Sequence, residues 1–173
     1  TKRLLWFLPL VFALGLFFST GLIFRFHPEI KTDPQFECLD VGTLKKALEN
    51  REAATDRLKK GAESLMILQN PNHTRNLKQP DAFLYLHGYS ATRQEISPVV
   101  EDLSAKLQWS VYFPRLRAHG LLDGEDFKTV RAQDWIDDSE EALQVARCLG
   151  EKVTLVAMSS GVPLALHLAI QHP

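Results

Sequence analysis

A strand pattern that runs directly into a serine between small residues constrains this chain most. Residues 152–157 (KVTLVA) are followed at once by MSSG at 158–161, where an apolar helical pattern begins. A nucleophile on such a strand-to-helix turn has a strained backbone, so the residues two before and two after it must be small. Ala157 and Gly161 meet this need for Ser159. The pattern predicts a nucleophile elbow with Ser159 as the candidate catalytic residue.

Ser160 is the competing serine. It would put Met158 and Val162 at the two small positions, and both side chains are too large. A turn centred on Ser159 aims the N-terminus of the next helix at the hydroxyl, where its positive partial charge favours developing negative charge. A serine that only caps the helix is the structural alternative.

Apolar runs and amphipathic helical patterns alternate along the second half of the chain. The runs are 82–86, 110–113 and 152–157, and the helical patterns between them are 96–107 and 132–149. Buried strands alternating with helices predict an α/β fold, a mostly parallel sheet with helices on both faces.

Further patterns predict three more elements before residue 82 and the polarity of two helix faces. Residues 43–58 predict an amphipathic helix with Thr43 as its cap, and 64–68 predict an edge strand. Residues 70–80 predict a loop. The predicted helix over 96–107 has one apolar face, made up of Val99, Val100, Leu103 and Leu107.

The predicted helix over 132–149 contains an acidic run that we interpret as a solvated face. Its members are Asp137, Asp138, Glu140 and Glu141.

A second motif follows the strand at 82–86, which ends in His87-Gly88-Tyr89-Ser90. Acyl transfer needs two hydrogen-bond donors for the oxyanion. The Ser160 backbone N–H, directly after the nucleophile, is one candidate. Gly88 allows a tight turn that leaves the Tyr89 N–H free to point inward as the other.

The segments YLHGYSAT, YFPRLRAHG, DW and VAMSSG, in this order, resemble the α/β-hydrolase superfamily in its esterase and monoacylglycerol-lipase branch. The resemblance covers residues 81–173. It implies Ser159 as nucleophile and the Tyr89 and Ser160 N–H groups as oxyanion hole. The resemblance also implies that four further residues hold the structure and take no part in catalysis: His87, His119, Asp134 and Trp135.

The resemblance also implies what should follow the nucleophile, because in this fold the acid and then the histidine come later in the chain. After Ser159 only His167 and His172 remain, with no Asp or Glu, and both lie on the helix leaving the elbow. We therefore expect an incomplete α/β-hydrolase, the N-terminal part of a longer protein, inactive by itself. The full-length protein would cleave carboxylic esters, such as acylglycerols or lysophospholipids. The alternative is an inert membrane-anchored pseudo-hydrolase or interaction module.

Residues 4–24 contain no charged residue and are long enough for a transmembrane helix. The alternative is a secretory signal with a cleavage site near 19–21. Basic residues flank the segment on both sides, so they do not fix its orientation. The expected organisation is an anchor or signal over 1–26, a linker with a helix and edge strand over 27–80, and the hydrolase part over 81–173.

Composition limits the remaining possibilities. The formal net charge of -1 argues against a nucleic-acid partner. Cys38 and Cys148 are too few for a disulfide framework and lie in no metal-binding pattern, so we expect free thiols. Neither a metal nor another cofactor is expected. The expected partners are an ester substrate and, through residues 4–24, the membrane.

Overall fold

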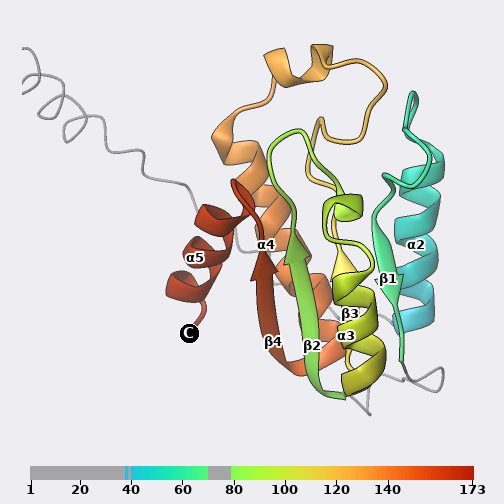
Figure 1. Ribbon diagram of the computed structural model, residues 1–173, viewed down its shortest axis with the longest axis vertical. Coiled ribbons are helices and arrows are strands. Elements are labelled where there is room, and N and C mark those ends of the chain that lie inside the picture. The colour runs from blue at the N-terminus through green and yellow to red at the C-terminus, as the bar shows by residue number, and fades with distance from the viewer. Residues whose placement is uncertain (1–37, 39, 70–78) are drawn as a thin grey trace, which may run out of the picture.

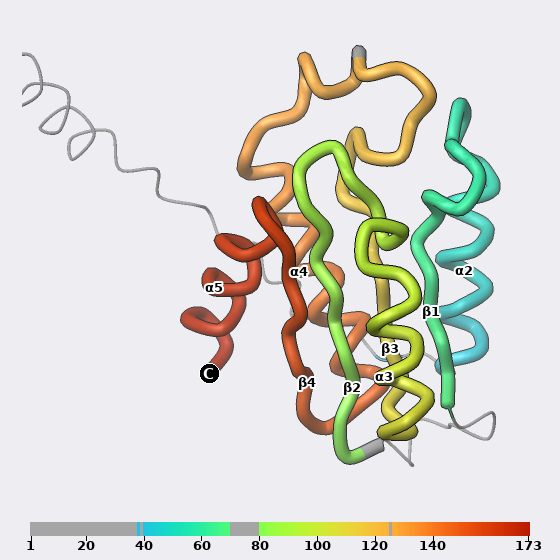
Figure 2. The backbone as a smooth tube through the Cα atoms, viewed as in Figure 1, coloured from blue at the N-terminus to red at the C-terminus, as the bar shows by residue number. Residues whose placement is uncertain are grey.

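A computed structural model describes Cys38, residues 40–69 and residues 79–173 (Figures 1 and 2). Four strands and four α-helices make up this part, together with two short 3₁₀ turns. In chain order they are α2 (Val41–Ala53), β1 (Leu65–Ile67), β2 (Gln79–Leu86), η1 (Arg93–Glu95), α3 (Val99–Leu107), β3 (Ser110–Phe113), η2 (Glu125–Lys128), α4 (Ala132–Leu149), β4 (Gly150–Ala157) and α5 (Gly161–Gln171).

The strands form one sheet in the order β1-β3-β2-β4. Strands β3, β2 and β4 are parallel, and β1 runs antiparallel to β3. The sheet is therefore mostly parallel, as the sequence predicts. Because β2 and β4 are parallel neighbours, their carboxyl ends lie at the same end of the sheet (Figure 2).

Alternate residues of β2 enter two separate cores. Ala82, Leu84 and Leu86 pack with α2, α4 and α5 on one face, whereas Phe83 and Tyr85 pack with β3 and α3 on the other. Figure 1 shows α3 in front of the sheet and α4 behind it. A strand buried on both faces reads as a continuous apolar run, which is why the sequence reveals β2 clearly.

Element boundaries differ from the sequence expectations for local reasons. Helix α2 begins at Val41, not at Thr43, because the Asp40 side chain caps it by accepting the Thr43 N–H at 3.1 Å. It ends at Ala53, shortly before a turn with positive φ at Arg57. Strand β2 begins at Gln79 because its pairing with β4 extends down to Gly150. The predicted strand at 110–113 and helix at 132–149 are confirmed.

The predicted apolar face of α3 is wrong for most of its members. Val100 is buried, but Val99 is 59% exposed, and Leu103 and Leu107 are also exposed. The helix instead places Ser104 against the sheet, where its hydroxyl donates to the Trp109 carbonyl at 2.6 Å. Ser104 can therefore be buried because its hydroxyl is hydrogen-bonded, although the apolar periodicity predicted leucines on the buried side of this helix.

The interpretation of the acidic run on α4 as a solvated face is also wrong for two members. Glu140 is only 3% exposed, and Asp138 is largely covered. Burial raises the pKa of Asp138 from its ordinary value, although Arg117 lies beside it. These carboxylates are tolerated inside because each has a hydrogen-bonding partner, described below.

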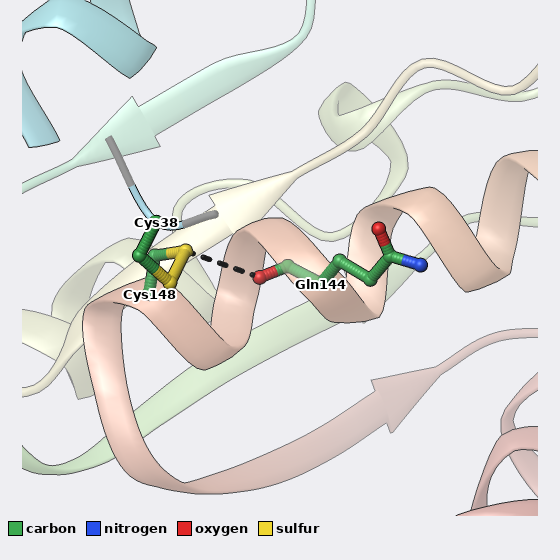
Figure 3. Close-up of a disulfide and its surroundings, with 3 residues drawn as sticks. All are labelled: Cys38, Gln144 and Cys148. Carbon is green, nitrogen blue, oxygen red and sulfur yellow. Dashed lines mark hydrogen bonds between the residues drawn. A yellow bond between two sulfur atoms is a disulfide. The ribbon is translucent and has the colours of Figure 1, made fainter. Parts of the chain in front are cut away.

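The prediction of free thiols is wrong, because Cys38 and Cys148 form a disulfide (Figure 3). Their Cα atoms are 5.5 Å apart although 110 residues separate them in the sequence. The bond joins the segment before α2 to the last turn of α4. Two isolated cysteines carry no pairing signal, and only the packing of α2 and α4 on one sheet face brings these two together.

The predicted transmembrane segment at 4–24 and the linker after it lie outside the described residues, as does most of the predicted loop at 70–80. Within 40–69 and 79–173, none of the helices combines the length and the apolar character that crossing a bilayer requires.

Candidate active site

The turn after β4 has the strained geometry that an elbow requires. Ser159 has φ +49°, a left-handed conformation that a serine rarely adopts. Three backbone hydrogen bonds fix the turn: Met158 N–H to Leu86 O at 3.1 Å, Gly161 N–H to Met158 O at 2.8 Å and Val162 N–H to Ser159 O at 3.1 Å. Ser159 is exposed. The turn therefore presents the hydroxyl at the carboxyl end of the sheet.

Gly161 shows why the elbow needs small residues. A Cβ at this position would lie 2.2 Å from the Leu86 carbonyl oxygen and 2.8 Å from the His87 carbonyl oxygen. Both obstructing atoms belong to backbone, so neither can rotate away. Only glycine lets α5 start this close to the end of β2.

The loop after β2 lies against the elbow. A Cβ built on Gly88 would be 3.2 Å from the Ser159 Cβ. Within the part of the chain that the structure describes, neither the Tyr89 N–H nor the Ser160 N–H donates a hydrogen bond. Gly88 and Ser159 are thus neighbours, and the two N–H groups predicted as oxyanion donors have no partner among the described residues.

Glu95 is a candidate site residue that the sequence analysis did not identify. Its Oε1 accepts the Gly88 N–H at 2.5 Å and the Tyr85 hydroxyl at 2.8 Å. Burial, together with this carboxylate, raises the pKa of Tyr85 above its ordinary value. No sequence signal marks Glu95, because it reaches the loop from a short 3₁₀ turn seven residues later in the chain.

His87 is completely buried and both of its ring nitrogens meet backbone atoms. Nε2 accepts the Leu116 N–H at 3.1 Å, which assigns the ring proton to Nδ1 and lets it donate to the Gly88 carbonyl at 3.0 Å. Burial lowers the pKa of His87. A neutral ring with both nitrogens occupied is suited to holding the loop and not to proton transfer.

His119 packs beside His87 with ring centroids 4.6 Å apart. Its Nδ1 lies 3.0 Å from the Arg117 carbonyl, to which the Trp135 indole N–H also donates at 3.0 Å. Burial, with the His87 ring nearby, lowers the pKa of His119 to about 4. At the start of α4, Asp134 accepts the Arg131 N–H at 2.8 Å. These contacts match the structural roles expected for His119, Asp134 and Trp135.

The two histidines that follow Ser159 in the chain hydrogen-bond to another side chain. Nε2 of His167 lies 3.0 Å from one oxygen of Glu140, and Nε2 of His172 lies 2.6 Å from the other. This cluster joins α5 to α4. Among the described residues no side chain hydrogen-bonds the Ser159 hydroxyl, so none of them is placed to act as its base.

An apolar cavity of about 240 Å³ opens beside the elbow, between the start of α4 and the start of α5. Its lining is Leu116, His119, Ala132, Trp135, Ile136, Ser160, Pro163, Leu164 and His167. A larger hollow of about 780 Å³ is lined by paired charges such as Arg117 with Asp138. The smaller cavity is the one next to the candidate chemistry. No group of three metal-ligating side chains occurs within 40–69 and 79–173.

Comparison with known proteins gives the fold. No protein-family model matches the sequence, and no curated protein does. A solved structure from work on two metagenome-derived lipolytic enzymes, LipS and LipT, is similar with a TM-score of 0.56 and 23% sequence identity. The match covers 67% of this chain and 43% of that one, so this chain spans less than half of that enzyme's length. At this identity the likeness shows the fold alone, a mixed α/β sheet with helices that is similar to the fold of that enzyme.

Proposed function

We propose that this chain is the nucleophile-bearing part of a membrane-anchored serine hydrolase of carboxylic esters. Ser159 Oγ attacks the ester carbonyl, the Tyr89 and Ser160 N–H groups bind the oxyanion, the alcohol leaves, and water then releases the acyl group. The observation that carries the proposal is the left-handed backbone of Ser159 at an exposed strand-to-helix turn. Such strain persists where function retains it.

The surroundings of Ser159 support this chemistry. The hydroxyl lies beside the N-terminus of α5, whose positive partial charge favours an oxyanion. The Tyr89 and Ser160 N–H groups have no partner within the described residues and stay available for the substrate oxygen.

The apolar cavity next to Ser160 supports an ester with an apolar group. Its volume, about 240 Å³, is smaller than the pockets of drug-sized ligands, which start at about 300 Å³. A short acyl or alkyl group therefore suits the described part of the site. Acylglycerols and lysophospholipids are proposed substrates because the anchor would hold the enzyme at a lipid surface.

A base for Ser159 is the remaining requirement. His167 and His172 both bind Glu140, so the proposal needs a histidine and its acid from outside the described residues. The same observation favours a second candidate, a catalytically inert membrane-anchored pseudo-hydrolase or interaction module.

A covalent serine probe separates the two candidates. Full-length protein is treated with a neutral fluorophosphonate, and the labelled peptide is mapped to distinguish Ser159 from Ser160. We expect labelling at Ser159, none in Ser159→Ala and none after heat denaturation. Native protein that stays unlabelled contradicts the enzyme and supports the inert module.

The disulfide supports a proposed location. Disulfides persist in oxidising compartments, so we place residues 38–173 on the oxidising side of the membrane that residues 4–24 would anchor. Trapping with a maleimide under denaturing conditions tests this. Peptide mapping should show neither Cys38 nor Cys148 modified before reduction, and Cys38 modified in the Cys148→Ser variant. Modification of both Cys38 and Cys148 in unreduced wild-type protein would contradict the proposal.

A further inference from the structure

Glu95 combines two properties at the loop that faces the nucleophile. It holds the loop by hydrogen bonds, and it brings a carboxylate next to Ser159. Resting on the proposed ester hydrolysis, we infer that Glu95 positions the oxyanion loop and selects for esters without negative charge near the scissile carbonyl.

The positioning follows from how the backbone of Gly88 is satisfied. Its N–H donates to Glu95 Oε1, and its carbonyl accepts from the Ala91 N–H at 3.2 Å and from the His87 ring. Both peptide groups of Gly88 are thereby fixed. The next N–H along the chain is that of Tyr89, the proposed oxyanion donor. Fixing Gly88 therefore sets the direction of that N–H.

The selectivity follows from the charge. A Cβ built on Gly88 would lie 3.2 Å from Glu95 Oε2 and also 3.2 Å from the Ser159 Cβ. The carboxylate and Ser159 are therefore both close to Gly88 and to each other. Within 40–69 and 79–173, no Lys, Arg or His forms an ion pair with Glu95; the nearby Arg93 pairs with Glu63 at 3.8 Å. An uncompensated carboxylate close to the reacting centre repels an anionic substrate and leaves neutral or cationic esters favoured. Of the two proposed lipid classes, this favours acylglycerols over lysophospholipids, whose phosphate is negative.

The two properties can be separated because both hydrogen bonds go to the same oxygen, Oε1. Glu95→Gln keeps an oxygen that can accept both bonds and removes the charge. Glu95→Ala removes both the bonds and the charge. Asp102→Asn is the matched control, since Asp102 is an exposed carboxylate on α3.

The test measures kcat/KM of the full-length protein on p-nitrophenyl butyrate and on the anionic mono-p-nitrophenyl glutarate. We expect Glu95→Gln to improve the anionic ester about fivefold relative to the neutral one, with a smaller gain at high salt. We expect Glu95→Ala to lower kcat/KM on the neutral ester about tenfold or more. Asp102→Asn should leave the ratio between the esters unchanged.

Hydrogen exchange of the backbone tests the positioning without turnover. Exchange at the Gly88 N–H, which donates to Glu95, should accelerate in Glu95→Ala and stay near the wild-type rate in Glu95→Gln. An unchanged ester ratio in Glu95→Gln overturns the selectivity, and equal exchange in both variants overturns the positioning. Wild-type protein that cleaves neither ester and resists the serine probe overturns the proposed function, and the selectivity with it.

Discussion

Two neighbouring segments carry the proposed chemistry, and they are held in opposite ways. The turn after β4 is fixed by its own backbone, with three main-chain hydrogen bonds, a left-handed Ser159 and a glycine where no Cβ fits. The loop after β2 is fixed by side chains from elsewhere, with His87 bonded to Leu116 and Glu95 bonded to Gly88.

This difference explains why the sequence predicts the turn at Ser159 in full, but predicts the loop after β2 without the side chains that hold it. A backbone-defined turn demands residue types at fixed spacing, which a sequence displays. A loop tied by tertiary hydrogen bonds depends on partners whose positions follow from folding. Substitutions should therefore affect the two segments differently.

The largest expected effect is at the backbone-defined turn. Gly161→Ala should lower the free energy of unfolding by about 3 kcal/mol or more, because the added Cβ meets backbone oxygens that cannot move. Gly124→Ala is the control, since a Cβ there has no atom within 4 Å and φ is -88°. Urea denaturation measures both variants. Similar losses in the two would contradict a steric demand at Gly161.

At the loop after β2, His87→Phe should cost about 2 kcal/mol, because it leaves the buried Leu116 N–H without an acceptor. His87→Gln offers a side-chain oxygen and should recover part of that loss. Thermal unfolding of the three proteins provides the comparison. Equal stability of the Phe and Gln variants would show that packing alone holds the loop.

Acid should also weaken the loop region. Burial lowers the pKa of His119 to about 4, so between about pH 6.5 and 4 the unfolded chain binds more protons than the folded one. The free energy of unfolding therefore rises with pH in that window. The His119 contribution is complete above pH 6.5 and is lost as pH falls from 6.5 to 4, which makes the protein about 2 kcal/mol less stable at pH 4.5 than at pH 7. His119→Phe should flatten the slope in urea titrations at pH 4.5 and 7. A slope equal to that of wild type would refute this assignment.

The smallest expected effect concerns the strain at Ser159. Ser159→Gly should raise the free energy of unfolding by up to about 1 kcal/mol, because glycine adopts φ +49° without a Cβ conflict. Ser159→Ala retains the Cβ and should not gain stability, although both variants lose the hydroxyl that the serine probe requires. Calorimetry distinguishes them. A more stable Ala than Gly variant would mean that the backbone there is unstrained.

Sequence reasoning recovered the elements whose signal is local. The buried strand at 110–113, the helix at 132–149 and the edge strand within 64–68 all follow from short apolar patterns, whereas the antiparallel direction of that edge strand does not. It was wrong where a polar group finds a distant partner. The sequence predicts Glu140 to be solvated, but in the fold it is buried and hydrogen-bonds His167 and His172 of the α5 segment. On α3, Ser104 is buried and the neighbouring leucines are exposed.

The sequence by itself determined the alternation of strands and helices and the small-Ser-small turn at Ser159, because both rest on residue types at short spacing. Only the tertiary structure decided the Cys38–Cys148 disulfide, the Glu140 cluster and the contact of Glu95 with Gly88. These pair residues through the packing of helices on a sheet, and no spacing along one chain specifies that distance. The hydroxyl of Ser159 is thus encoded locally, whereas the loop that faces it is assembled by the fold.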